Sequence, residues 1–270
     1  MFTRHPVKRR PSSANRPPPQ RNRNLLLAAL PPQDYRRIAR SLDTVPLRLK
    51  SLLHRAGDPV EHVYFPGGGF FSMVTELKDG RMVEVATIGR EGMVGITAVL
   101  DHPVSSTSMV QGEADTCYRM KADVFRREMD RRGVFYELLT HYAQALLGFI
   151  VQSTACNAVH SVEQRLARWL LMARDRMESD HFMLTQEFAA MMLGASRPTV
   201  TIVASTLQRA GLITYHRGDL TIVDGEGLEA ASCECYRATT DLLNAVMKRA
   251  RRRQAAHSPK PARKRFRARA

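Results

Sequence analysis

The sequence predicts an α+β protein with an N-terminal antiparallel β-roll, a long helix, and a C-terminal unit of short helices with a β-hairpin. Between residues 45 and 120, short stretches rich in Val, Phe, Tyr, Met and Thr alternate with turn residues, as strands of a roll do. Between residues 123 and 177, Gly and Pro are scarce and helix-forming residues dominate. Between residues 182 and 223, two short helical patterns precede two alternating stretches.

The composition is that of a globular protein, and the charge is concentrated at the two ends. The 270 residues are 44% apolar and 25% charged, which suits about two domains. Of the 41 basic residues, seven lie in residues 1–23 and eleven in residues 248–270, and neither segment has an acidic residue. The net charge of +15 therefore belongs to two tails, whereas the middle of the chain is net −3. We expect both tails to be disordered, and either to attract DNA or RNA without specificity or only to aid solubility.

Several classes of protein are disfavoured. The longest unbroken apolar run, Ala145–Val151, is too short to span a bilayer. The basic N-terminus continues through Pro17–Pro19 without an apolar stretch, so no secretory signal is predicted and a cytoplasmic location is expected. Four scattered cysteines do not make a disulfide framework. The close pair Cys233 and Cys235 lacks a second pair to complete a zinc site, so no metal is predicted.

The β-roll is expected in a domain of residues 24–133. A helical lead-in, interrupted by Pro31 and Pro32, opens this domain. Turn markers such as Pro66–Gly69 and Lys78–Gly80 then separate short apolar stretches. Four of these stretches are predicted strands: His62–Phe65, Phe70–Glu76, Met82–Ile88 and Ser106–Val110.

A long helix over residues 134–160 carries a regular seam. Spacings of three and four residues alternate along it, a repeat of about 3.5 residues that suits a two-stranded coiled coil. We interpret the seam as a homodimer interface, although the same stripe could instead pack on the β-roll of its own chain. Its members are Leu139, Tyr142, Leu146, Phe149, Ser153 and Cys156.

Helix-capping signals organise the next domain, residues 161–247. Ser161 is a predicted N-cap, and Gln164 three positions later completes a capping box. Thr185 is a second predicted N-cap, and the helix that follows it, Gln186–Leu193, has about two turns.

A tight turn and a second helix complete a helix-turn-helix pattern. Gly194 and Ala195 form the turn, and Ser196 caps a helix whose first turn accommodates Pro198. One face of this helix is apolar, whereas the other carries short side chains, hydroxyls and arginine, the profile of a helix that enters the major groove of DNA. Alternating residues around His216–Asp219 predict a hairpin, or wing. The predicted DNA-binding residues are Thr185, Gln186, Ser196, Arg197, Thr199, Thr201, Ile202, Ser205, Arg209 and Arg217.

Three strings make the chain resemble regulators of the Crp/Fnr superfamily, which are bacterial transcription factors. They are SVEQRLARWLL at 161–171, LTQEFAAMMLGASRPTV at 184–200 and LQRAGLI at 207–213. The resemblance extends over about residues 24–238. It implies a cyclic-nucleotide-binding-like β-roll, a dimerisation helix and a winged helix-turn-helix, with double-stranded DNA, a second copy and RNA polymerase as partners.

The resemblance also assigns roles in the recognition helix. Arg197 matches the arginine that reads guanine in this family, and Thr199 matches a threonine that contacts a phosphate. Pro198 and Ile202 stand where the best-known members carry further base-reading residues. The half-site of those members is therefore not expected here, and Ile202 could meet thymine methyl groups or pack beside Pro198.

The predicted effector site departs from that of the cyclic-AMP-binding relatives. The glycine of their Gly-Glu pair is kept, but an isoleucine follows it, and the stretch 104–109 has no arginine for the phosphate. Cyclic AMP is therefore disfavoured, because its charge would lack a cation. The hydroxyl groups of Thr97 and of residues 105–108 would suit a neutral or sugar-like effector, or they would form only a solvated strand edge. The candidate effector residues are Gly95, Ile96, Thr97, Ser105, Ser106 and Thr107.

No other cofactor is predicted, and no catalytic residue. The first cysteine, Cys117, comes too late for the N-terminal iron–sulfur ligands of the oxygen-sensing branch, whereas His62, His102 and His141 leave haem open. A metal-dependent, cupin-like enzyme is one alternative, although His62 has no second histidine nearby. A general nucleic-acid-binding protein driven by the basic tails is another.

Overall fold

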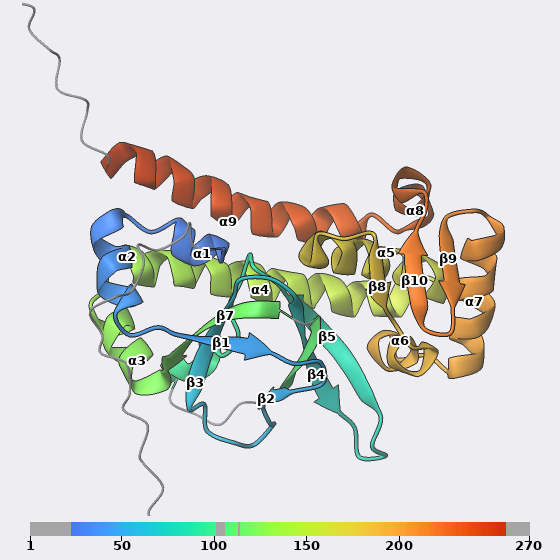
Figure 1. Cartoon of the computed structure of the whole chain (residues 1–270), viewed down its shortest axis with the longest axis horizontal. Helices are drawn as coiled ribbons and strands as arrows, with labels where there is room; N and C mark the ends of the chain where they lie inside the picture. Colours follow the sequence, from blue (N-terminus) through green and yellow to red (C-terminus); the bar gives the residue numbers. More distant parts are fainter. Residues whose placement is uncertain (1–22, 101–105, 113, 258–270) are drawn as a thin grey trace, which may run out of the picture.

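The computed structural model describes residues 23–100, 106–112 and 114–257, and they form a β-roll, a long central helix and a helix-rich C-terminal unit (Figure 1). The strands are β1 (Asp43–Leu47), β2 (Leu52–His54), β3 (His62–Pro66), β4 (Phe70–Glu76), β5 (Met82–Ile88), β6 (Thr107–Gly112), β7 (Ala114–Lys121), β8 (His181–Met183), β9 (Ile213–His216) and β10 (Asp219–Ile222). The helices are α1 (Leu25–Ala28), α2 (Pro32–Ala39), the 3₁₀ helix η1 (Ile96–Leu100), α3 (Ala122–Asp130), α4 (Val134–Val159), α5 (Val162–Met177), α6 (Gln186–Leu193), α7 (Arg197–Arg209), α8 (Gly225–Ala231) and α9 (Cys235–His257).

The roll consists of two antiparallel sheets, with strand orders β1-β7-β3 and β2-β6-β4-β5. The four strands predicted from the sequence are confirmed as β3 to β6, with boundaries that differ by two residues at most. Apolar side chains of both sheets, among them Val63, Phe65 and Phe71, are completely buried between them. The alternation of apolar and polar residues thus specifies both the strands and the inner face of the roll.

The seam along α4 is buried within its own chain, so its interpretation as a dimer interface is wrong. The Tyr142 hydroxyl donates to the carbonyl of Met93 at 3.0 Å, and Cys156 Sγ lies 3.5 Å from Cys233 Sγ. A 3.5-residue repeat specifies an apolar stripe but not the element that covers it. Here the roll and the C-terminal elements cover it, and every seam member is at most 6% exposed: Leu139, Tyr142, Leu146, Phe149, Ser153 and Cys156.

α4 is also the one helix within the described ranges that is long and apolar enough to cross a membrane. Its largest apolar side chains, such as Phe135 and Phe149, are buried in the core beside the roll and α9. Its composition is therefore explained by its place as the central helix of the fold.

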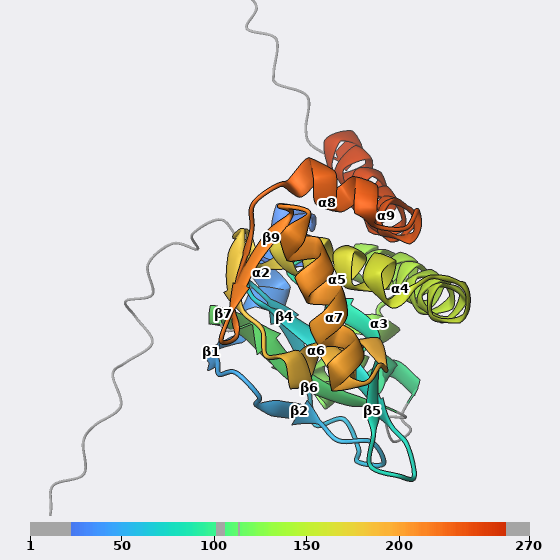
Figure 2. The ribbon, with the colours of Figure 1, turned by 90° about the vertical axis from the view of Figure 1, so that its right-hand side faces the viewer.

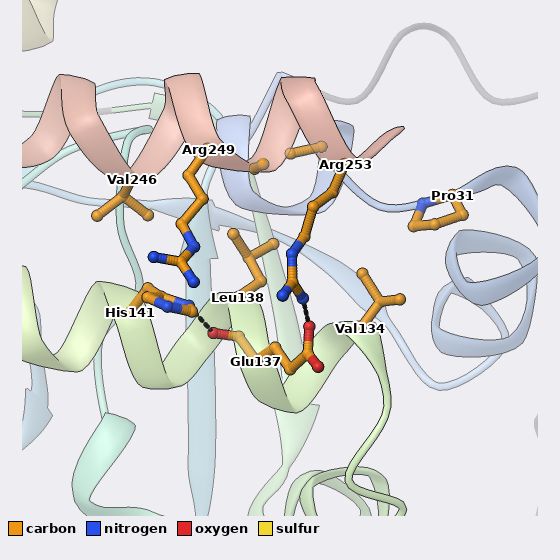
Figure 3. A pocket seen from close by; sticks show the side chains of 10 residues that line it. Pro31, Val134, Glu137, Leu138, His141, Val246, Arg249 and Arg253 are labelled. Atoms are coloured by element: carbon orange, nitrogen blue, oxygen red, sulfur yellow. Dashed lines mark hydrogen bonds and ion pairs between the residues drawn. The ribbon is translucent and has the colours of Figure 1, made fainter. Parts of the chain in front are cut away.

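The C-terminal segment from residue 248 continues as helix rather than as the disordered tail that was expected. α9 runs alongside α4 to His257 (Figure 1). Val246 and Met247 are both buried, and Arg253 forms an ion pair with Glu137 of α4 (Figure 3). Val246 and Met247, just before the basic run, and Ala250 within it pack against the core, and these apolar contacts hold the helix in place. Residues 1–22 and 258–270, the rest of the two predicted tails, lie outside the described residues.

Candidate nucleic-acid interface

Capping hydrogen bonds fix both helices of the helix-turn-helix. Thr185 Oγ1 accepts from the backbone N–H of Phe188 at 3.2 Å, and Ser196 Oγ accepts from that of Thr199 at 3.3 Å. Between the helices, Gly194 adopts a left-handed conformation with φ of +58°, which glycine adopts without strain. The predicted boundaries of α6 and the predicted start of α7 are therefore confirmed.

The two faces of α7 differ as the sequence predicts. Val200, Ala204 and Leu207 are buried, and the helix packs against α5 and α6. The opposite side faces solvent at one end of the molecule, where α7 runs across the face turned towards the viewer in Figure 2. Ile202 is 66% exposed, and α7 carries no acidic residue. The other exposed side chains of this face are Arg197, Pro198, Ser205 and Arg209.

Some of the predicted hydroxyl groups already have partners within the protein. Thr201 is half-buried, and its hydroxyl lies 2.8 Å from Gln186 Oε1 and 3.0 Å from the Arg197 carbonyl. Ser196 Oγ and Thr199 Oγ1 lie 2.7 Å apart. These groups hold α6 and the start of α7 together, whereas the arginines and Ser205 remain open to a ligand.

The wing lies next to the start of the recognition helix. β9 and β10 are joined by Arg217 and Gly218, both with positive φ, and β8 completes a three-stranded sheet. The wing and the two helices enclose a shallow hollow of about 290 Å³ that Arg197 and Arg217 both line. Two positive side chains that are far apart in the sequence thus converge on one hollow, which suits a phosphate backbone.

The cavity between the roll and α4 has a volume of about 420 Å³. Of the predicted effector residues, four line it: Gly95, Ile96, Thr97 and Ser106. Thr107 does not, since its hydroxyl accepts from the backbone N–H of Ala56 at 3.2 Å, and Ser105 lies outside the described residues.

The cavity between the roll and α4 is mainly apolar. Burial lowers the pKa of His54, the one ionisable side chain among the described residues that line it. His54 Nε2 donates to the carbonyl of His62 at 2.7 Å, and a side chain at position 95 would collide with the His54 ring. Gly95 is therefore required by close packing as well as by its φ of +88°.

A second cavity, of about 360 Å³, lies between α4 and α9 (Figure 3). His141, one of the histidines considered for haem, points into it, with Nδ1 2.5 Å from the Glu137 carbonyl. Burial and the positive charge of Arg249 lower the pKa of His141. His102, another of those histidines, lies outside the described residues.

Polar contacts between the roll and α5 were not predicted. Trp169 of α5 donates through Nε1 to Glu84 of β5 at 2.9 Å. Arg176 of α5 forms an ion pair with Glu91 at 3.0 Å and also lies 3.3 Å from the Thr87 carbonyl. These contacts join residues that are more than 80 positions apart, and no local pattern in the sequence signals them.

Contrary to the expectation from the sequence, Cys233 and Cys235 have two further potential metal ligands beside them. The fold brings Cys156 and His160 beside them, and the donor atoms of all four lie within 4.8 Å of one another. The available signal was the spacing of Cys156 and His160, because residues four apart on a helix share a face.

Both halves of the chain match known families. The Crp-like helix-turn-helix domain matches residues 164–231, and the cyclic nucleotide-binding domain matches residues 44–132. The comparison with curated proteins gives no match. Among solved structures, a crp/fnr-family transcriptional regulator from Eubacterium rectale has a TM-score of 0.58 at 18% identity, over 76% of this chain and 96% of that chain.

Two further regulators have the same TM-score of 0.58. TTHB099, a CRP-family regulator from Thermus thermophilus, is 17% identical over 71% of this chain and 99% of its own. The c-di-GMP-responsive regulator CLP from Xanthomonas campestris is 16% identical over 70% of this chain and 98% of its own. At these identities the structures show a shared fold. With the two matching domains joined by α4 in that fold, the chain belongs to the Crp/Fnr superfamily, a family of transcription regulators rather than of enzymes.

Proposed function

We propose that the chain is a sequence-specific DNA-binding regulator that acts as a homodimer in the cytoplasm. The observation that carries the proposal is the exposed, acid-free face of α7, with Arg197 at its start and Arg209 at its end. A helix of this profile fits the major groove, where arginine can donate two hydrogen bonds to guanine. Arg217 of the wing is placed to contact the neighbouring phosphates. By family resemblance, RNA polymerase would be a further partner.

Replacing Arg197 tests this assignment. The protein first selects duplexes from a random library, and fluorescence anisotropy then measures its affinity for the selected site and for random DNA. Arg197→Ala should lower the affinity for the selected site by about 1–3 kcal/mol and change binding to random DNA little. Arg127→Ala, which removes an exposed arginine of α3 far from α7, is the matched control. An equal loss on both kinds of DNA would contradict the role of Arg197 in base readout.

We infer that the dimer forms through the open side of α4. Exposed residues on this side recur at spacings of four and three, the repeat of a coiled coil, and α4 lies at one edge of the molecule in Figure 2. Leu147 and Val151 are 62% and 61% exposed, and Leu100 of η1 is 65% exposed. The stripe consists of Thr140, Gln144, Leu147, Val151, Thr154 and Ala158.

A second copy is the occupant that suits this stripe. One α7 covers one half-site, so two copies would read a pseudo-palindrome with half-sites roughly 34–36 Å apart. Apolar side chains at a regular helical spacing also gain from burial against an identical helix.

We further propose that the cavity beside α4 takes an uncharged, largely apolar effector. Among its described lining residues, Met73, Ile88 and Met93 supply apolar surface, whereas Ser106 and Ser108 supply hydroxyls. A cyclic nucleotide phosphate would meet no guanidinium or ammonium group among these described lining residues, at a high cost in desolvation. Isothermal titration with cyclic AMP should therefore give no heat of binding. A saturable heat would contradict the proposed ligand class and leave the assignment of α7 intact.

A further inference from the structure

A compact cluster of three cysteines and one histidine lies where α4 meets the C-terminal unit. Cys156 and His160 are one helical turn apart at the end of α4, and Cys233 and Cys235 flank Glu234 at the start of α9. The three cysteines are at most 4% exposed. Their sulfurs and the imidazole nitrogen all lie within 4.8 Å of one another. Buried thiols that share a site with an imidazole are the donors that zinc prefers.

We propose that this cluster binds one Zn²⁺, coordinated by the sulfurs of Cys156, Cys233 and Cys235 and by Nδ1 of His160. In protein zinc sites, Zn–S bonds are about 2.3 Å and Zn–N bonds about 2.0 Å. A tetrahedron with these bonds has edges of about 3.8 Å between two sulfurs and about 3.6 Å between sulfur and nitrogen. The observed distances are 3.5 Å from Cys156 Sγ to Cys233 Sγ and 3.6 Å from Cys235 Sγ to His160 Nδ1. These two distances are close to the edges of such a tetrahedron.

The groups around the cluster support the same assignment. Glu234 lies 3.2 Å from Nε2 of His160, so its carboxylate can hold a proton on Nε2 and leave the lone pair of Nδ1 for a metal. Gln152 Nε2 donates to Cys235 Sγ at 3.0 Å, a contact that favours a thiolate. Histidine ligands in zinc sites commonly carry such a carboxylate on the second nitrogen.

The charge around the cluster is also suitable. A Zn²⁺ ion with three thiolates and a neutral histidine has a net charge of −1. The guanidinium of Arg168 is 6% exposed and close enough for its charge to act on Cys156. Arg168 Nε and Nη1 find no hydrogen-bond acceptor among the described residues. A buried cation without acceptors is costly, and a negatively charged metal centre beside it would offset that cost.

The site would fix the orientation of the C-terminal unit. Two of the ligands, Cys156 and His160, lie at the end of α4. Ser161, the N-cap of α5, follows His160 directly. Of the other two ligands, Cys233 lies in the turn before α9 and Cys235 is the first residue of α9. One ion would thus tie together the end of the long helix, the entry to the helix-turn-helix and the start of α9.

Metal analysis of the full-length chain tests the proposal. The protein is produced with a tag that binds no metal and is purified under reducing conditions without chelator. Elemental mass spectrometry should find one zinc per chain. Cys235→Ala should lower the zinc content at least tenfold, whereas Cys117→Ala, which alters a buried cysteine of β7, should not change it. Glu234→Gln changes an exposed residue, should leave the fold intact, and should weaken zinc binding about 10- to 100-fold.

Cobalt gives an independent spectroscopic readout. Co²⁺ added to the metal-free wild-type protein should produce a thiolate-to-metal charge-transfer absorption and the visible bands of a tetrahedral ion. Cys117→Ala should give the same spectrum, and Cys235→Ala should not. Wild-type protein that carries no zinc and gives no such spectrum would overturn the proposal. A disulfide between Cys156 and Cys233 in the freshly purified protein, found by peptide mapping without bound metal, would overturn it as well.

Discussion

The contact between Glu84 and Trp169 predicts a pH dependence of stability that one substitution should abolish. Glu84 is 8% exposed, and its carboxylate accepts hydrogen bonds from Trp169 Nε1 at 2.9 Å and from the Ser72 hydroxyl. Burial raises its pKa from 4.5 to about 7, because desolvation disfavours the charged form. The two hydrogen bonds and the positive charges of Arg168 and Arg176 oppose this rise without cancelling it.

The direction of the effect follows from proton binding. Between pH 4.5 and about pH 7 the folded protein holds the Glu84 proton and the unfolded chain does not, so the stability from this group falls as the pH rises. The full loss is about 3.5 kcal/mol, at roughly 1.4 kcal/mol per pKa unit, and about 2.5 kcal/mol of it falls between about pH 5 and pH 8. Glu84→Gln cannot ionise, and its amide can still accept from Trp169 and donate to Ser72. The free energy of unfolding of the variant, relative to wild type, should therefore rise by about 2.5 kcal/mol over that range.

Urea unfolding followed by tryptophan fluorescence measures this difference directly. Trp169 is the only tryptophan of the chain, so its emission reports on the contact itself. Glu76→Gln, which alters an exposed carboxylate of β4, is the matched control and should differ from wild type by the same amount at every pH. Parallel pH profiles for Glu84→Gln and wild type would refute the reasoning, since Glu84 would then titrate alike in the folded and unfolded states.

Three other changes test the dimer contact, the turn of the helix-turn-helix and the role of the basic tails. Val151→Asp places a charge on the open stripe of α4 and should shift sedimentation to that of a monomer, whereas Val223→Asp, equally exposed at 61%, should not. Gly194→Ala adds a Cβ at a φ of +58° and should lower the free energy of unfolding by about 1 kcal/mol, and an unchanged value would contradict the assigned turn. Removing residues 1–22 and 258–270 should preserve the selection of one DNA sequence and reduce the salt dependence of DNA binding. Loss of that selection would contradict sequence recognition by α7 and assign it to the tails.

Local signals in the sequence predicted much of the fold. Thr185 and Ser196 marked the starts of α6 and α7, because a capping side chain acts within three residues of itself. The strands β3 to β6 were bounded by glycine and proline turns, which also act locally. Several elements were not predicted individually, among them β8 (His181–Met183), which depends on its pairing with β10, and α8 (Gly225–Ala231).

Features that depend on distant contacts could not be predicted in the same way. The periodicity of α4 defined one apolar stripe, but only the fold decides that the roll and α9 cover it. Between Lys248 and Arg253 the one apolar residue is Ala250, so no apolar stripe in the sequence predicts the continuation of α9. Cys156 and Cys233 are separated by 77 positions, and their proximity follows from the path of the whole chain.

The segment between β5 and η1 connects the cavity beside α4 to the helix-turn-helix unit by a short route. Met93 lines the cavity, and its carbonyl accepts the Tyr142 hydroxyl. Two residues earlier, Glu91 pairs with Arg176 of α5, which is only 6% exposed. A ligand that displaces Met93 would strain this ion pair, and a buried guanidinium that loses its carboxylate has little access to water as a substitute. Such a ligand would therefore favour the orientation of α5, and hence of α7, in which Arg176 stays paired. The size of this shift depends on the difference between the ligand's affinities for the two orientations.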